Sequence, residues 1–212
     1  MRERSLAAKV ACAVVMAILT AAYGVRVWYV NAYPFEQPAP VEHYGMGEWV
    51  DLDGTYLIAP YQSPEDYEVK VDKAELMSPR EYVERYGAKG AELPPEGEEG
   101  TVVSLEVEIS HKGDGEVGIV LFEQRLIPER RNIAYRYDPE LWWEAEPALR
   151  DTPGMFALRP GSTYVAHVPF SFPGYPDYFV AYDDAKRPEI TDTSFELLLS
   201  NLPVQTVVDI EL

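Results

Sequence analysis

Cysteine is almost absent from this chain of 212 residues, and a common hydrolase motif is missing altogether. The single cysteine, Cys12, lies in an apolar N-terminal segment, so disulfide frameworks and thiol chemistry are excluded for everything that follows. The chain has no Gly-x-Ser-x-Gly elbow and no Gly-Lys-Ser phosphate loop. These absences argue against a serine hydrolase and a P-loop enzyme.

Basic side chains are also scarce, since 18 Lys and Arg stand against 36 Asp and Glu. Beyond residue 30 there remain 14 basic and 35 acidic side chains, which is a formal charge of −21. Such a surface repels phosphate backbones, so nucleic acid is excluded as a partner. We interpret the acidity first as a means of solubility, with recognition of a cationic partner as the alternative.

Histidine is the third scarce residue, and no pair of His43, His111 and His167 has the spacing of metal ligands. We interpret each as a structural histidine. The pairs Asp51 with Asp53 and Asp183 with Asp184 offer oxygen atoms to calcium, but they lack the EF-hand spacing, so turn formation is the favoured interpretation. The sequence therefore predicts no catalytic residue, no cofactor and no metal site.

Residues 10–30 are apolar except for Arg26, and 21 residues are enough for a helix to cross a bilayer. Arg2, Arg4 and Lys9 precede this run, so the positive-inside rule predicts a cytoplasmic N-terminus at residues 1–9 and an extracytoplasmic C-terminal part. We predict a single-pass protein of the cell membrane. The alternative is a signal peptide cleaved near Ala22, which would release a secreted protein.

Past the anchor, Pro34, Pro38 and Pro40 predict an extended tether over residues 31–46, and residues 47–212 are enough for one domain. Apolar and polar side chains alternate most clearly over residues 101–110 and 163–172. Capping patterns predict short helices at 79–86 and 140–144. We expect a mainly β fold: an antiparallel β-sandwich of seven to eight strands with one or two short helices.

Some of these segments resemble a known family. The alternating strand Val103 to Ile109, the turn at Gly113 to Gly115, and Leu158 to Gly161 followed by a strand are similar to the immunoglobulin-like (telokin-like) extracytoplasmic domains of Gram-positive bacteria. The resemblance covers about residues 48–212. It implies an immunoglobulin-like sandwich on a membrane-anchored protein of uncharacterised function, and it supplies no catalytic residues. The sequence departs from the family at His111, where an asparagine is usual.

One aromatic segment, residues 172–187, is the candidate recognition loop. Tyrosine on a loop offers a large amphipathic contact area at low entropic cost. The alternative is an ordinary loop that covers one end of the sandwich. The candidate residues are Tyr175, Tyr178, Phe179 and Tyr182.

Together these features favour a membrane-tethered extracytoplasmic binding or accessory module that is not an enzyme. Its partner would be an extracellular protein, peptide or glycan. One alternative is a cell-envelope hydrolase that uses paired carboxylates, which requires a pocket holding two of them. Another is a structural partner of a membrane complex, which requires a continuous apolar patch.

Overall fold

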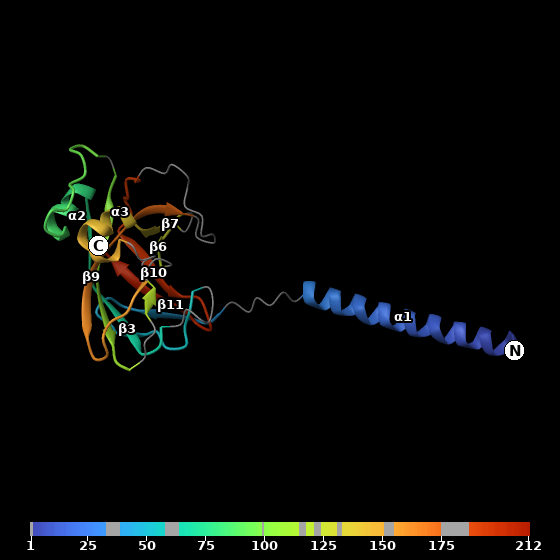
Figure 1. Ribbon diagram of the computed structural model, residues 1–212. Coiled ribbons are helices and arrows are strands. Elements are labelled where there is room, and N and C mark those ends of the chain that lie inside the picture. The colour runs from blue at the N-terminus through green and yellow to red at the C-terminus, as the bar shows by residue number, and fades with distance from the viewer. Residues whose placement is uncertain are drawn as a thin grey trace. The chain divides into compact units, whose positions relative to one another are not determined.

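The computed structural model describes residues 2–32, 39–57, 64–98, 100–114, 118–120, 124–130, 133–150, 155–174 and 187–212 (Figure 1). The chain divides into two compact units, Met1–Pro38 and Ala39–Leu212. The four aromatic residues of the candidate recognition loop, Tyr175, Tyr178, Phe179 and Tyr182, lie outside the described residues.

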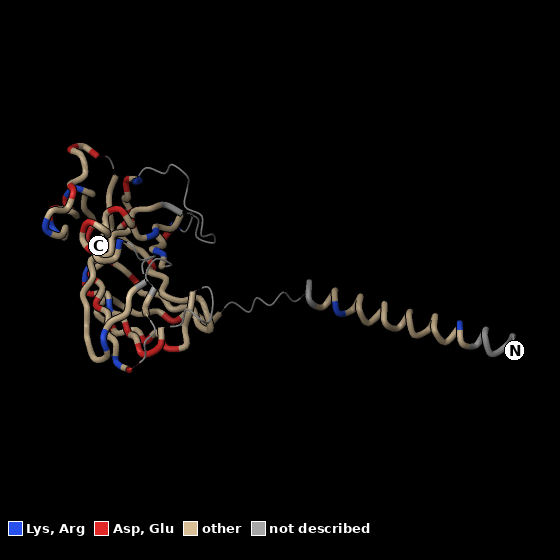
Figure 2. Tube along the Cα trace, in the orientation of Figure 1, with Lys and Arg blue, Asp and Glu red and all other residues tan. Residues whose placement is uncertain are grey.

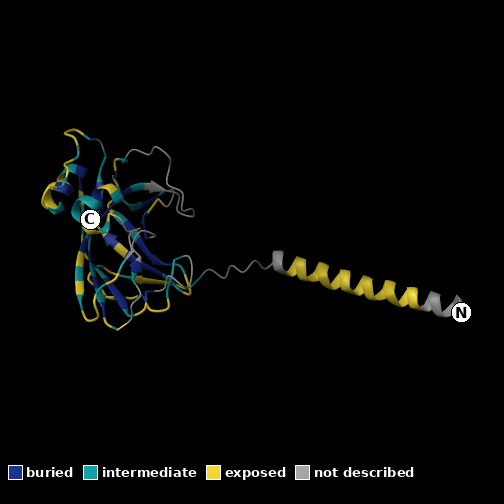
Figure 3. Ribbon diagram, viewed as in Figure 1, coloured by how far each residue is buried: buried dark blue, intermediate teal, exposed yellow. Residues whose placement is uncertain are grey.

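The first unit contains α1, a helix of 31 residues from Arg2 to Ala32. Its span Ala8–Tyr29 has 22 residues with a mean hydropathy of 2.0, and none of that apolar window is buried in the protein (Figure 3). At about 1.5 Å per residue the span is about 33 Å long, which matches the hydrocarbon core of a bilayer. The prediction of an N-terminal helix that is able to cross a membrane is confirmed.

The second unit is built mainly of strands, as predicted. Nine strands form one sheet in the order β1-β11-β10-β6-β7-β9-β4-β3-β2, and β5 pairs with β8 in a separate two-stranded sheet. The strands are β1 (Val41–Tyr44), β2 (Val50–Asp51), β3 (Tyr67–Met77), β4 (Val102–His111), β5 (Ile119–Val120), β6 (Arg125–Pro128), β7 (Ala134–Tyr137), β8 (Met155–Phe156), β9 (Thr163–Gly174), β10 (Ser194–Ser200) and β11 (Gln205–Glu211).

The large sheet curls until its ends approach each other, so it resembles a nearly closed barrel more than an immunoglobulin-like sandwich. After β2, Tyr56 forms an antiparallel bridge with Leu202, which lies between β10 and β11. The short connection between the edge strands β1 and β2 also bonds to the sheet, because the amide of Gly47 donates to the carbonyl of Val71 over 2.8 Å. Alternation of apolar and polar residues predicts strands but not the order in which they pair. The observed pairing joins the strands into one continuous sheet instead of the two sheets of a sandwich.

Strand β1 corrects the predicted boundary of the domain. Residues 41–44 were expected in the tether, yet they pair in parallel with β11, with Val41 opposite Gln205 and Tyr44 opposite Val208. All other strand pairs in the large sheet are antiparallel. The parallel neighbour is distant in sequence, so local composition did not reveal it.

The core lies inside the curled sheet. On β4 the predicted apolar face of Val103, Leu105, Val107 and Ile109 is buried, whereas the alternate Glu106 and Glu108 are half-buried. Burial of about 25 cal/mol per Å² of apolar surface is the main favourable term in such a fold. The largest fully buried side chains are Trp142, Tyr67, Tyr82, Phe170, Leu105, Ile109, Ile119, Leu126, Ile190, Leu197 and Ile210.

Two short helices, α2 (Pro79–Tyr86) and α3 (Pro139–Ala145), lie next to each other at one end of the folded unit (Figure 1). Each begins as its capping pattern predicts: Ser78 accepts a bond from the amide of Glu81, and Asp138 accepts one from the amide of Leu141. A 3₁₀ turn, Pro147–Leu149, follows α3. A second, smaller apolar cluster joins the two helices to the sheet and contains Met77, Tyr82, Val83, Val102 and Leu141.

Candidate functional site

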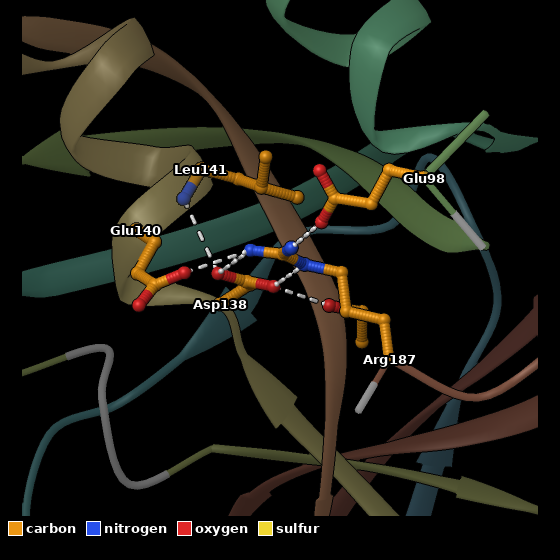
Figure 4. Close-up of polar contacts among 6 residues, drawn as sticks. Glu98, Asp138, Glu140, Leu141 and Arg187 are labelled. Carbon is orange, nitrogen blue, oxygen red and sulfur yellow. Dashed lines mark hydrogen bonds and ion pairs between the residues drawn. The ribbon is translucent and has the colours of Figure 1, made fainter. Parts of the chain in front are cut away.

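The most concentrated group of charges in the described residues surrounds Arg187, the last residue of the candidate recognition loop. Its guanidinium group donates from Nε to Asp138 Oδ2 over 2.6 Å and from Nη2 to Glu140 Oε2 over 3.1 Å. Nη1 donates to Glu98. Figure 4 shows the three carboxylates arranged around this one guanidinium group. We call these four residues the arginine cluster.

Asp138 holds the cluster in place because both its carboxylate and its backbone amide form hydrogen bonds. Oδ1 caps α3 by accepting the amide of Leu141 over 3.2 Å, and Oδ2 accepts the hydroxyl of Ser171 on β9 over 2.6 Å. The amide of Asp138 donates to the carbonyl of Pro169 over 2.7 Å. Asp138 is fully buried, so the carboxylate depends on these donors and on Arg187 for the solvation that water would supply.

The electrostatics of the cluster favour a charged arginine. Burial works against the charged form of Arg187, but the hydrogen bonds and negative charge of Asp138, with further charge from Glu98 and Glu140, raise the pKa of the guanidinium above its ordinary value. The side chain of Arg187 is 14% exposed and that of Asp138 is 1% exposed, whereas Glu140 is 75% exposed. The cluster therefore runs from a buried ion pair to a solvated carboxylate.

Beside this cluster lies a pocket of about 240 Å³. One part of its lining is apolar: Leu93, Pro94, Pro95 and Leu141. The other part is charged and consists of Glu92, Glu98, Glu140, Glu144 and Arg187. Acidic residues occur along much of the folded unit (Figure 2), so the acidity alone does not mark the pocket. What marks it is the combination of a concave shape, an apolar wall and converging carboxylates.

The pocket has a definite architecture. Glu144 on α3 accepts the amide of Glu92 over 2.6 Å and pairs with Arg150 over 2.7 Å. Arg80 on α2 donates to the carbonyl of Pro94 over 3.0 Å. The segment of residues 92–98 is thus attached to both short helices, and it brings its carboxylates and prolines to one place.

This arrangement is suited to a cation rather than to an anion. The guanidinium of Arg187 already donates to three carboxylates, so an anionic ligand would have to displace them. Glu140 keeps most of its surface in solvent and is therefore available to a positively charged group. The apolar wall offers contact to the hydrocarbon stem of a long cationic side chain.

Metal ligation is not supported among the described residues, where no group of three or more His, Cys, Asp or Glu side chains is placed to hold an ion. Asp51 accepts the amide of Asp53 over 2.9 Å, and Asp53 accepts the amide of Asp66, so this pair forms turns as interpreted from the sequence. The other pair, Asp183 and Asp184, lies outside the described residues.

The three histidines lie in three different places. His43 on β1 is exposed and contacts Asp209 over 2.9 Å. His111 is buried, its ring stacks on Tyr67 at 4.4 Å, and Nδ1 is 2.9 Å from the carbonyl of Leu158. His167 lies on β9 beneath α2, with its ring stacked on Tyr86 at 3.9 Å. They share no site.

A glycine-rich stretch at residues 113–118 resembles a nucleotide-binding turn in its spacing, contrary to the expectation that the chain lacks this pattern. Gly113, Gly115 and Gly118 have the spacing Gly-x-Gly-x-x-Gly of dinucleotide-binding turns. Such a turn must lead from a strand into a helix, whose N-terminus binds the pyrophosphate. Here the described glycines, Gly113 and Gly118, lie between the strands β4 and β5, and Gly115 lies outside the described residues. The element that follows the pattern is therefore a strand and not the helix that such a turn requires.

Sequence reasoning found the cap at Asp138 but missed the arginine cluster. Asp138 precedes Pro139 and signals the start of a helix, whereas Arg187 is separated from it by 49 positions. The available signal was a basic pair, Lys186 and Arg187, at the end of an acidic and aromatic segment. That signal does not identify which carboxylates the arginine contacts, because the sheet pairing decides it.

A protein-family model described as "Domain of unknown function (DUF5028)" matches residues 41–206. The match begins at β1 and ends at the start of β11, so it covers most of the folded unit and excludes α1. No curated protein and no solved structure matches the chain.

Proposed function

The chain belongs to the DUF5028 family, and on that premise we propose that it is a membrane-anchored, non-catalytic binding module whose pocket receives a cationic group of a partner. The apolar helix α1 supplies the anchor. The basic residues before it, Arg2, Arg4 and Lys9, support an extracytoplasmic location for the folded unit. A cell-surface protein or peptide that presents a lysine or arginine fits this chemistry.

The observation that carries the proposal is the composition of the pocket wall. A lysine side chain has a four-carbon stem and a charged head, and it is best held by an apolar surface that ends in carboxylates. Leu93 and Pro94 provide the apolar surface, and Glu140 provides the carboxylate. The negative charge of the whole unit would also speed the approach of a cationic partner, and that effect would weaken with added salt.

A binding role is preferred over hydrolysis because of what the pocket carboxylates already do. Hydrolysis by two carboxylates needs one that is kept protonated as an acid and one that stays ionised. Glu98 and Glu140 both pair with Arg187, and Glu144 pairs with Arg150. These carboxylates thus already act as partners of cationic side chains, which is the chemistry that binding of a further cation requires.

The proposal is tested with two acetylated and amidated tripeptides, Gly-Lys-Gly and Gly-norleucine-Gly, titrated by NMR into the full chain in neutral detergent micelles. The lysine peptide should bind and the neutral one should not. Glu140→Gln should weaken lysine binding by about two- to fivefold, as expected for a partly solvated ion pair. Glu129→Gln, at an exposed position outside the pocket lining, is the matched control. Equal binding of the two peptides, or equal effects of the two variants, would refute the proposal.

A further inference from the structure

A second titratable cluster lies on the outer face of the sheet, under α2. His167 projects from β9, and α2 covers it with two tyrosines. The ring of Tyr86 stacks on the imidazole with centroids 3.9 Å apart and planes 16° apart, and the hydroxyl of Tyr82 donates to the backbone carbonyl of His167 over 2.5 Å. The imidazole is thus part of the surface on which α2 docks.

The imidazole of His167 has one ring nitrogen without a hydrogen-bond partner among the described residues. Its Nδ1 is buried and has no hydrogen-bond partner, and the nearest carboxylate oxygen, on Glu106 of β4, is 3.9 Å away. A neutral imidazole tolerates this better than an imidazolium, because a buried N–H without an acceptor retains its full desolvation cost. Docking of α2 therefore favours the neutral form of the ring.

Charged groups from every neighbouring element act on His167. Desolvation beneath α2 is the largest influence and lowers the pKa of His167 below its ordinary value. Glu106 on β4, Glu146 after α3 and Glu75 on β3 oppose this effect, and Lys73 on β3 reinforces it. Tyr86 itself is fixed by donating its hydroxyl to Glu75 over 3.2 Å. Burial outweighs the three carboxylates, so the docked state resists protonation.

We propose that His167 makes the docking of α2 sensitive to pH, so that mild acid loosens α2 and with it the wall of the neighbouring pocket. Because the pocket is the binding site of the proposed function, the consequence for binding rests on that proposal, whereas the response of α2 does not. The link between the two is direct: Arg80 on α2 bonds to the carbonyl of Pro94 in the pocket wall, and residues 87–91 join α2 to that wall.

The direction follows from proton linkage. A histidine whose pKa is lower in the docked state binds protons more readily when α2 is open, so the stabilisation is complete above about pH 6.5 and declines as pH falls below it. At pH 5.5 an exposed histidine of ordinary pKa is about 90% protonated. The opening constant of α2 can therefore rise by at most about elevenfold relative to high pH. We expect an increase of about three- to tenfold.

The experiment is amide hydrogen exchange of the full chain in detergent micelles at pH 7.5 and 5.5, corrected for the intrinsic effect of pH on exchange. The amides of Tyr82 and Gly87, which donate within α2 and its cap, should lose protection three- to tenfold at pH 5.5, whereas the amides of β4 should not. His167→Phe keeps an aromatic ring under Tyr86 and removes the titration, so its α2 amides should not respond to pH. His43→Gln, at an exposed histidine, should behave like the wild type.

A second variant keeps the inference testable if His167→Phe does not fold. Glu106→Gln removes a carboxylate that attracts the proton, so its α2 amides should respond to acid at least as strongly as those of the wild type. The inference is overturned if wild-type α2 protection is the same at both pH values, or if His167→Phe responds as the wild type does. Failure of the lysine peptide to bind at either pH, with an intact response of α2, would refute only the proposed function.

Discussion

Removal of the guanidinium at position 187 is the sharpest test of how this fold is held together, because one side chain joins three segments that are distant in sequence. Arg187→Met keeps much of the side-chain length but leaves the fully buried Asp138 carboxylate without its cation. Within the described part of the chain, the remaining donors to the Asp138 carboxylate are the amide of Leu141 and the hydroxyl of Ser171. Two neutral donors compensate a buried carboxylate only in part.

The magnitude can be estimated from this geometry. Breaking a buried ion pair by removing one partner typically costs about 3–5 kcal/mol, because the other charge stays buried. For a domain of this size each kcal/mol lowers the melting temperature by about 2–4 °C. We therefore expect Arg187→Met to lower the melting temperature of the folded unit by roughly 10 °C. The loss of about 3–5 kcal/mol is a large share of the free energy of unfolding of an ordinary domain.

Arg130 supplies a matched control within the same chain. It contacts Asp192 through Nε and Nη2, both over 3.0 Å, but its side chain is 66% exposed. Arg130→Met removes the same chemical group from an arginine that is mostly solvated, although its partner Asp192 is itself only 13% exposed. Because solvent weakens the pair on the arginine side, Arg130→Met should lower the melting temperature less than Arg187→Met does. The comparison tests how the cost of losing the guanidinium depends on burial of the pair.

A double-mutant cycle completes the test. Asp138→Asn can keep the cap of α3, since asparagine and aspartate cap equally well; it removes the charge and replaces one acceptor oxygen with an NH2 group. In the double variant with Arg187→Met no buried charge is left unpaired at these two positions, so the combined cost should be about 2 kcal/mol smaller than the sum of the single costs. The free energies are measured by urea unfolding of the full chain in detergent. If Arg187→Met costs no more than Arg130→Met, or if the cycle shows no coupling, the cluster does not stabilise the fold in this way.

Two further predictions concern the anchor and the core. Ile18→Arg in the middle of the apolar span should make the free energy of membrane insertion less favourable by about 2.5–3.5 kcal/mol, whereas Val10→Arg beside Lys9 should have a much smaller effect. Carbonate extraction of membranes measures the inserted fraction. Equal extraction of both variants would contradict a spanning helix. Leu105→Ala on β4 should cost about 2–5 kcal/mol in urea unfolding because Leu105 is fully buried, and Leu76→Ala, at a position 42% exposed, should cost much less; similar losses would place the core elsewhere.

The strands and the helix starts were predictable because their causes are local. The alternation of Val103, Leu105, Val107 and Ile109 defines one buried face whatever the neighbouring strand is. Ser78 before Pro79, and Asp138 before Pro139, satisfy the first amides of their helices with their own side chains. The apolar run that forms α1 was predictable for the same reason, because its length and composition are local properties of the sequence.

What local reasoning did not supply was the order of the strands. The expected sandwich of seven to eight strands became one nine-stranded sheet, since β1 joins β11 across more than 160 positions of sequence. Nothing in Val41 to Tyr44 identifies that partner. Strand pairing depends on main-chain groups that every residue carries, so the choice among partners is made by the whole fold.

The candidate site follows the same division. The sequence by itself determined that the chain has an apolar segment long enough to span a bilayer, an acidic remainder and a mainly β pattern. Composition and periodicity are properties of the sequence, so they can be read without knowing the fold. Only the tertiary structure brought Arg187 to Asp138, Glu98 and Glu140, and only it placed Tyr86 over His167. Contacts between distant positions arise from packing of the elements. The physical reason is that a buried charge or ring needs a partner, and the fold of the whole sheet decides which residues lie close enough to be that partner.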